Sequence, residues 1–221
     1  MLELKTNYRS IKTLVDAGAK LIENNGACQI QKPALSNRKE TKPIFVYASA
    51  HTDEELYREQ TAKHCLNRIS EYLERGFSAN DVLVLTRYMR TKIEGRTEYF
   101  KIIRTFLDSA KHKGIRVAVD HAQEHNAIKL LTVHKCKGLE AKVVFVLNVV
   151  KGQFGFPSEI EDPAILEVAR GDNGIEDQKE ERRLFYVAIT RAKEDLYIYT
   201  KQKENSEFLG EVAAYTSSVP L

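Results

Sequence analysis

The chain has 221 residues, of which 43% are hydrophobic and 29% are charged, and its formal net charge is +3. This balance is typical of a globular chain that buries a core, and it excludes an intrinsically disordered or collagen-like protein. A net charge this small is compatible with nucleic acid as a partner but does not indicate it. Only local basic patches could indicate such a partner.

Apolar runs in the sequence are shorter than the roughly 18 residues that would span a bilayer, and no signal-peptide pattern follows Met1. The three cysteines form no CxxC pair, and the six histidines show no ligand spacing. We therefore expect a cytoplasmic protein without a membrane partner, a disulfide framework or a metal site.

Hydrophobic periodicity predicts the elements of the first half of the chain. Apolar residues recur at helical intervals in two segments, and two apolar or β-branched runs are typical of strands. The better marked helix begins with a capping box of Thr52 and Glu55. The predicted elements are a helix opened by residues 7–10 and ended near 24–26, a surface loop over 27–41, a strand over 43–49, the helix from Thr52 to Gly76, and a buried strand over 82–86.

The second half begins with a basic cluster of Arg87, Arg90, Lys92 and Arg96, directly after the strand over 82–86. Open α/β sheets bind ligands at this edge, although a solvated loop would show the same charges. The elements predicted after it are a helix over 99–113, strands over 115–119, 128–134 and 142–150, a long loop over 151–178 with a short helix at 165–169, a helix capped by Asp177 and Glu180, and a final strand over 195–200.

Strands that alternate with helices predict a single α/β domain over residues 1–221, with a doubly wound, mainly parallel sheet and helices on both faces. Such folds often bind nucleotides. The sequence nevertheless contains no GxxxxGK[ST] phosphate loop and no strand that ends in an acidic pair able to hold magnesium. ATP chemistry would therefore need a phosphate cradle from another domain.

The segment EERRLFYVAITRAK, residues 180–193, places Arg191 on the same helical side as Leu184, Val187 and Ala188. Two interpretations remain open for this arginine. It could extend to water from an amphipathic helix, or it could be held rigidly at the surface to meet a phosphate, which suits its planar guanidinium.

Three segments, LKTNYRS (4–10), LTVHKCKGLE (131–140) and EERRLFYVAITRAK (180–193), together resemble the last helicase motifs of superfamily 1 enzymes of the UvrD/Rep type. The short gap between the first two segments, with VLTRY, GFPS and ENSEFLGEV, is most similar to the DNA helicase IV branch. The resemblance implies a RecA-like P-loop NTPase fold without its own P-loop, serving as the second motor lobe. KCKGLE resembles the 3′ to 5′ group.

The resemblance also implies roles at a nucleotide. Tyr8 would stack on adenine, Arg9 and Arg191 would reach the γ-phosphate, Glu140 would accept a hydrogen bond from the ribose, and Gly138 would allow a tight turn nearby. ATP and Mg²⁺ would bind only together with an N-terminal RecA-like domain. The alternatives are a surface Tyr8 and Arg9 at a helix start, and a Glu140 that merely ends a turn.

Single-stranded DNA is the other ligand that the resemblance implies. Arg87 would contact a phosphate, Tyr88 would offer a stacking face, and Thr132 and His134 would lie where a strand meets DNA. Thr132 could instead be only a strand residue, and His134 could be structural.

The predicted function is therefore the C-terminal motor domain of an ATP-dependent 3′–5′ DNA helicase, inactive as an isolated chain. The alternative is a catalytically silent RecA-like module that docks on RNA polymerase or another partner. A third hypothesis, that the chain is part of a helicase–nuclease, ranks last, because no nuclease-like cluster of carboxylates and lysine follows Thr200.

Overall fold

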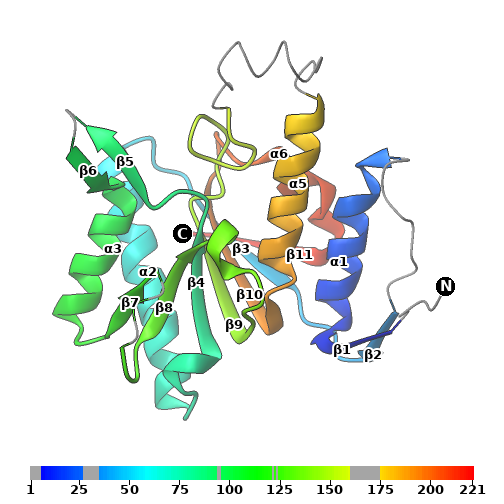
Figure 1. Cartoon of the computed structure of the whole chain (residues 1–221), viewed down its shortest axis with the longest axis horizontal. Helices are drawn as coiled ribbons and strands as arrows, with labels where there is room; N and C mark the ends of the chain where they lie inside the picture. Colours follow the sequence, from blue (N-terminus) through cyan, green and yellow to red (C-terminus); the bar gives the residue numbers. More distant parts are fainter. Residues whose placement is uncertain (1–5, 27–34, 94–95, 121, 123, 160–174) are drawn as a thin grey trace.

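The computed structural model describes residues 6–26, 35–93, 96–120, 122, 124–159 and 175–221, except the side chains of 91–96 and 175–177. At its centre lies a seven-stranded sheet in the order β11-β3-β10-β9-β4-β8-β7 (Figure 1). Every pairing in this sheet is parallel. The predicted doubly wound parallel sheet is thus confirmed.

The elements follow one another in the alternating order that the sequence predicts for most of the chain. Their bounds are β1 Thr6–Ile11, α1 Lys12–Glu23, β2 Leu35–Arg38, β3 Ile44–Ser49, α2 Glu54–Glu74, η2 Ala79–Asp81, β4 Val82–Thr86, β5 Arg90–Ile93, β6 Arg96–Tyr99, α3 Lys101–His112, β7 Val117–Val119, β8 Ile128–Thr132, η3 Val133–Cys136, β9 Ala141–Leu147, α5 Ile175–Ile189, β10 Ala192–Lys201, α6 Glu207–Glu211, η4 Ala213–Tyr215 and β11 Thr216–Pro220.

Helices cover both faces of the sheet, which explains why the central strands are apolar at nearly every position. Side chains alternate along a strand, so Val144 and Val146 of β9 pack toward α1, α5 and α6. Val143 and Phe145 of the same strand pack toward α2 and α3. All five residues of β4 are buried for the same reason.

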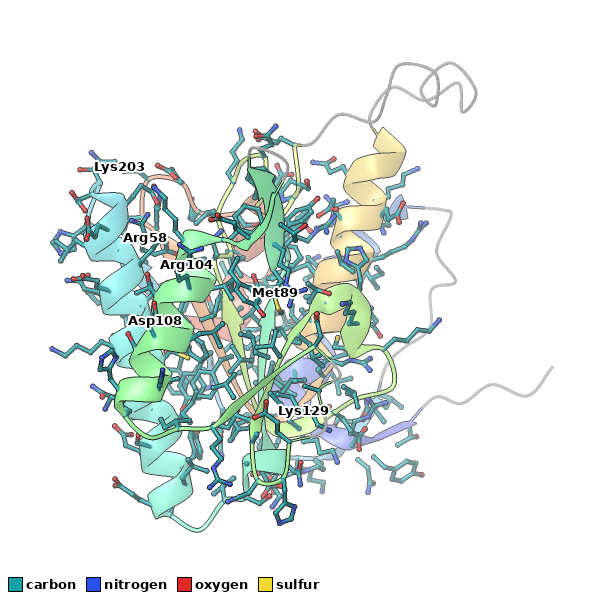
Figure 2. The ribbon with its side chains drawn as sticks, turned by 60° about the vertical axis from the view of Figure 1, so that its left-hand side comes forward. Arg58, Met89, Arg104, Asp108, Lys129 and Lys203 are labelled. Carbon is teal, nitrogen blue, oxygen red and sulfur yellow. The ribbon has the colours of Figure 1, made fainter. Side chains whose placement is uncertain are left out.

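The outer helices are amphipathic in the way that their position requires. Along α3, Ile103 and Phe106 are buried against the sheet, whereas Arg104 and Asp108 lie on the solvent side (Figure 2). Among the described residues, no helix has the length and the apolar character needed to cross a membrane.

The first predicted helix begins later than expected. Asn7–Ser10 belongs to strand β1, which pairs in parallel with β2. Asn7 Oδ1 accepts the backbone N–H groups of Arg9 at 2.8 Å and Ser10 at 3.1 Å, and such local side-chain bonds compete with a helix start. The segment 27–41 was expected to be a loop, but its described part, residues 35–41, contains strand β2. The helix itself begins at Lys12, since Ile11 keeps the extended conformation of β1 and is the N-cap of α1.

Other boundaries also differ from the predictions. Asp53, rather than Thr52, caps α2 by accepting the N–H of Leu56. Threonine and aspartate are both favoured N-cap residues, so residue type alone did not distinguish the two positions. The basic segment after β4 forms the antiparallel hairpin β5–β6. Strand β10 is not the last strand of the sheet, because β11 follows it in the chain and pairs with β3 at the sheet edge. The sequence of β11 is Ser-rich and gives little indication of a strand. The short helix expected at 165–169 lies outside the described residues.

Candidate functional site

The register of the central sheet brings the three motif segments together. Ala192 of β10 pairs with Ala141 of β9, and the N–H of Ala141 donates to the carbonyl of Arg191 at 3.1 Å. From the N-terminal segment, Ser10 Oγ donates to the carbonyl of Ala192 at 2.7 Å. Residues 9, 140 and 191, which are far apart in sequence, therefore meet at the amino ends of β9 and β10.

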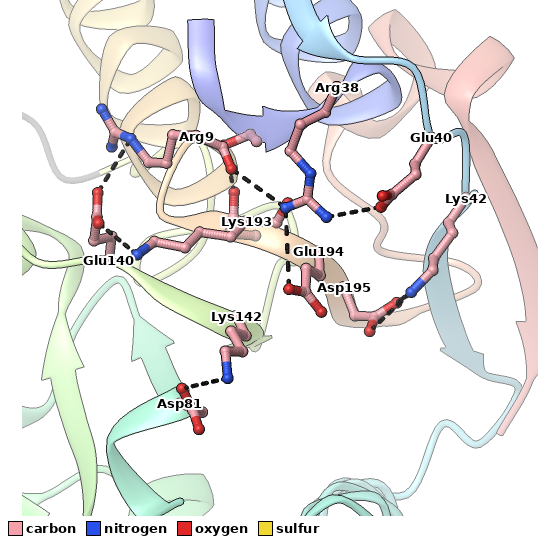
Figure 3. A network of polar contacts seen from close by, with 12 residues as sticks. Arg9, Arg38, Glu40, Lys42, Asp81, Glu140, Lys142, Lys193, Glu194 and Asp195 are labelled. Carbon is pink, nitrogen blue, oxygen red and sulfur yellow. Dashed lines mark hydrogen bonds and ion pairs between the residues drawn. The ribbon is translucent and has the colours of Figure 1, made fainter. Parts of the chain in front are cut away.

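Four side chains form what we call the arginine cluster: Arg9, Glu140, Arg191 and Lys193. Arg9 Nε lies 3.1 Å from Glu140 Oε2, and Lys193 Nζ lies 2.5 Å from Glu140 Oε1 (Figure 3). The Lys193 hydrogen bond, followed by the charges of Lys193, Arg9 and Arg191, lowers the pKa of Glu140 despite partial burial. Three cations thus surround one ionised carboxylate, which leaves excess positive charge.

Arg191 is held by neutral acceptors. Its guanidinium donates to the carbonyls of Leu139 and Val187, both at 3.1 Å, and to Thr190 Oγ1 at 3.4 Å. In the described part of the chain, no carboxylate lies within ion-pair distance of it. The group is therefore fixed in orientation, and its charge has no direct counter-ion among the described residues, an arrangement suited to a phosphate.

Tyr8 and Gly138 are close in sequence to members of this cluster but do not belong to it. Tyr8 is 72% exposed on β1, beside Arg9 in the chain. Gly138 has φ +84°, a left-handed conformation that favours glycine, while no heavy atom lies within 4 Å of the place where a Cβ would stand. Its role here is thus to turn the backbone just before Glu140, and not to allow close packing.

The four residues predicted to contact DNA line one hollow, which we call the strand-end groove. Its volume is about 290 Å³, and it lies where β4 and β8 end side by side, with Thr86 paired to Thr132. The structure therefore brings the four residues together. The groove is lined by Arg87, Tyr88, Met89, Arg90, Asp120, Thr132, His134 and Lys135.

Arg87 already has a carboxylate partner inside the protein. Its Nε lies 3.0 Å from Glu181 Oε2, its Nη2 contacts Glu181 Oε1, and both side chains are only 10% exposed. Glu181 also accepts the N–H of Ser158 at 3.1 Å, and the guanidinium lies over the Tyr88 ring at 4.3 Å. This bidentate pair joins β4 to α5, so Arg87 has a structural role in addition to any ligand contact.

Exposed cations lie elsewhere in the groove. Arg90 is exposed and donates to Tyr99 Oη at 2.8 Å, and Lys135 pairs with Asp120 at 3.0 Å. Partial burial, followed by the charge of Arg87, lowers the pKa of His134 below its usual value. The lowered pKa favours the neutral imidazole, which can donate or accept a hydrogen bond but carries no charge.

The arginine cluster lies at the amino ends of the central strands and the strand-end groove at their carboxyl ends, and residues 133–140 join the two regions. This segment leaves the carboxyl end of β8 as the short helix η3, packs against α5 and reaches the amino end of β9. Cys136, in its middle, is buried and donates to the carbonyl of Val133 at 3.0 Å. One continuous piece of chain therefore contributes side chains to both regions.

Lys193 and Lys135 were not singled out from the sequence. Lys193 is the second residue of β10, two positions after Arg191, and it pairs with Glu140. Its place beside the motif arginine was a signal available in the sequence. Lys135 could be recognised only after its partner Asp120 was placed by the fold. Within the residues that the structure describes, no group of three or more His, Cys, Asp or Glu is arranged to hold a metal ion.

The family model described as "UvrD-like helicase C-terminal domain" matches residues 2–107 and 97–203 of the chain. The chain belongs to this family. The matched ranges include every member of the arginine cluster and of the strand-end groove, so both regions lie within the shared domain.

Relatives of this UvrD-like domain are named as helicases. It is 39% identical over 131 residues to the Bacillus subtilis protein named "Putative ATP-dependent DNA helicase YjcD", covering 58% of this chain and 16% of YjcD. It is 39% identical over 80 residues to the ATP-dependent DNA helicase PcrA of Staphylococcus aureus, covering 36% and 10%. The chain therefore spans only a small part of the length of these relatives.

A solved structure has a similar fold. The C-terminal domain of a possible DNA helicase from Lactobacillus plantarum superimposes with a TM-score of 0.55 at 15% identity, covering 96% of this chain and 98% of that one. The fold of this UvrD-like domain is thus that of a helicase C-terminal domain.

Proposed function

We propose that this chain is the C-terminal motor domain of an ATP-dependent 3′–5′ DNA helicase, forming one RecA-like lobe over residues 1–221. The observation that carries the proposal is the convergence of Arg9 and Arg191 around the same short segment, Leu139 and Glu140, with excess positive charge at an exposed face. An N-terminal RecA-like domain of the same parent would supply the phosphate cradle and the Mg²⁺ ligands.

The arginine cluster, together with the exposed ring of Tyr8 beside Arg9, fits one half of a nucleoside triphosphate site, since the two offer cations and a stacking face. Arg191 and Arg9 would neutralise charge on the γ-phosphate, a role worth about 10³ to 10⁵ in rate for such arginines. Arg9 would exchange Glu140 for that phosphate. Tyr8 would stack on the adenine and Glu140 would accept a hydrogen bond from the ribose. Bound ATP supplies the phosphoryl group whose transfer to water releases the driving free energy.

The strand-end groove would hold single-stranded DNA. Arg90 and Lys135 are exposed and are better placed than Arg87 for phosphate contacts, because Arg87 already pairs with Glu181. Thr132 and His134 would offer hydrogen bonds. Because residues 133–140 reach both regions, a shift at Glu140 on nucleotide binding would also move the wall of the groove, which changes the affinity for DNA between two states.

The test uses the parent protein that joins this lobe to its ATP-binding domain. We expect Arg191→Ala to abolish DNA-stimulated ATP hydrolysis while ATP binding persists, and Arg191→Lys to restore little, because lysine lacks the planar guanidinium. Arg183→Ala, at an exposed position of the same helix, is the matched control and should remain active. Robust DNA-stimulated turnover by residues 1–221 alone would contradict the proposal.

A second candidate is a catalytically silent module that docks on RNA polymerase or another partner. It is favoured by the internal contacts of two motif arginines: Arg87 is paired with a carboxylate of the protein, and Arg191 donates to three acceptors of its own. A docking module of this kind would keep partner binding after Arg191→Ala and would show no ATPase activity to lose, so the same variant separates the two candidates.

A further inference from the structure

Three aromatic side chains form a small cluster beside the strand-end groove, which we call the aromatic platform: Tyr88, Phe100 and Phe154. The ring centroids of Phe100 and Phe154 are 4.7 Å apart, and Phe154 meets Tyr88 at 5.6 Å and 83°. The rings come from three separate segments: the chain after β4, the start of α3 and the loop after β9. Phe154 is nevertheless 37% exposed.

The loop that carries Phe154 is folded tightly on itself. Phe156 N–H donates to the carbonyl of Val150 at 2.9 Å, and a Cβ added at Gly155 would lie 1.8 Å from that same oxygen. Phe156 is fully buried against Phe185 at 5.3 Å. Because one phenylalanine anchors the loop in the core, its neighbour Phe154 is presented outward at a fixed place.

Tyr88 connects the platform to the groove, since it belongs to both. Arg87 covers its ring at 4.3 Å, and its hydroxyl lies 2.9 Å from Ser158 Oγ, so Tyr88 is fixed on both counts. Phe154 is the member of the platform with a markedly exposed ring. A planar ligand would therefore stack on Phe154 rather than on Tyr88.

A single exposed aromatic residue is common on protein surfaces and indicates nothing alone. Here the exposed ring adjoins a groove that carries Arg90 and Lys135. A ligand that fits both must combine repeated negative charge with flat, unpaired aromatic groups. Single-stranded nucleic acid has this combination, because its phosphates follow a cationic groove while its bases stack on aromatic side chains.

We infer that Phe154 is a stacking site for an unpaired nucleobase, whose flanking phosphates lie in the strand-end groove. This inference rests on the proposed binding of single-stranded DNA and adds to it the residue that holds a base. Every base has a π face, so the contact tolerates any sequence. Tyr88 and Phe100 support the ring from behind and act as positioning residues.

The test compares two probes for the 221-residue chain, an oligothymidine of about 12 nucleotides and an abasic oligonucleotide with the same number of phosphates. We expect Phe154→Ala and Phe154→Leu to weaken binding of oligothymidine roughly 5- to 150-fold, the range given by ~1–3 kcal/mol per stacked base, and to leave abasic binding unchanged. Leu56→Ala, which alters a residue of similar exposure on α2, is the control. Circular dichroism confirms that each variant is folded.

Phe154→Trp provides a direct signal, because the chain contains no tryptophan. Its emission should be quenched by oligothymidine and not by the abasic probe. A matching oligouridine reports whether DNA or RNA is preferred, and quenching by either supports stacking. If wild type binds both probes and the Phe154 variants bind oligothymidine equally well, the stacking site is wrong but the groove stands. If wild type binds no probe, the proposed DNA contact fails as well.

Discussion

The arginine cluster contains Arg9 and Arg191, the strand-end groove contains Arg87, and the arginines of the two regions differ in their surroundings. Arg191 is oriented by neutral carbonyls, and Arg9 shares an exposed carboxylate with Lys193. Arg87 forms a bidentate, nearly buried pair with Glu181. The difference teaches that a motif position alone does not define a role. An arginine is available to a ligand when its own partners leave its charge uncompensated.

The largest expected effect is on catalysis. In the parent protein, Arg191→Ala should reduce kcat for ATP hydrolysis by about 10³ to 10⁵, because it removes charge stabilisation at the γ-phosphate. Steady-state ATPase measurements with saturating DNA check this. Loss below tenfold would place Arg191 with Arg87, among arginines that mainly support the fold.

The next effect is on stability, and here the strand-end groove, rather than the arginine cluster, should show the larger loss. Arg87→Ala leaves Glu181 nearly buried without its partner and should lower the free energy of unfolding by about 3–5 kcal/mol. Arg9→Ala removes an exposed pair and should cost about 0.2–1 kcal/mol. Urea denaturation of the 221-residue chain measures both, with the exposed Arg104→Ala as the control. Equal losses would erase the contrast.

A smaller effect is expected for Tyr8. Because its ring is 72% exposed, Tyr8→Ala should leave the urea midpoint unchanged. It should raise KM for ATP in the parent roughly tenfold, as expected for loss of one base–aromatic stack. Tyr8→Phe is the matched control and should behave as wild type. An unchanged KM for Tyr8→Ala would exclude Tyr8 as the adenine contact.

The smallest effect concerns pH. Partial desolvation and the charge of Arg87 lower the pKa of His134, so protonation of this side chain opposes folding. Stability therefore decreases as pH falls through the usual histidine range near ~6.5. Bound phosphates favour the protonated ring, so DNA affinity should rise severalfold from about pH 7.5 to about pH 6. His134→Gln should flatten this rise. Fluorescence anisotropy at fixed ionic strength measures it, and an identical slope in the variant would exclude His134 from the groove's ligand contacts.

Strong periodicity made the central elements predictable. The run Val82–Thr86 was expected to be buried on both faces, and it is, because each side chain meets one of the two helical layers. The prediction failed for β1 and β11, where polar contacts determine the secondary structure. The side chain of Asn7 accepts the N–H of Arg9 in β1, and β11 depends on backbone pairing with β3. No periodicity reports either kind of bond.

The sequence by itself determined the doubly wound sheet, the family and the residues that form its motifs, because apolar period and motif spacing are local properties of the chain. Only the tertiary structure decided which charges remain available. The register of Ala192 with Ala141 placed Arg191 beside Glu140, and the packing of α5 against the end of β4 gave Arg87 its partner. Ion pairing depends on the distances between side chains in the folded protein, and these distances cannot be derived from the spacing of the residues in the sequence.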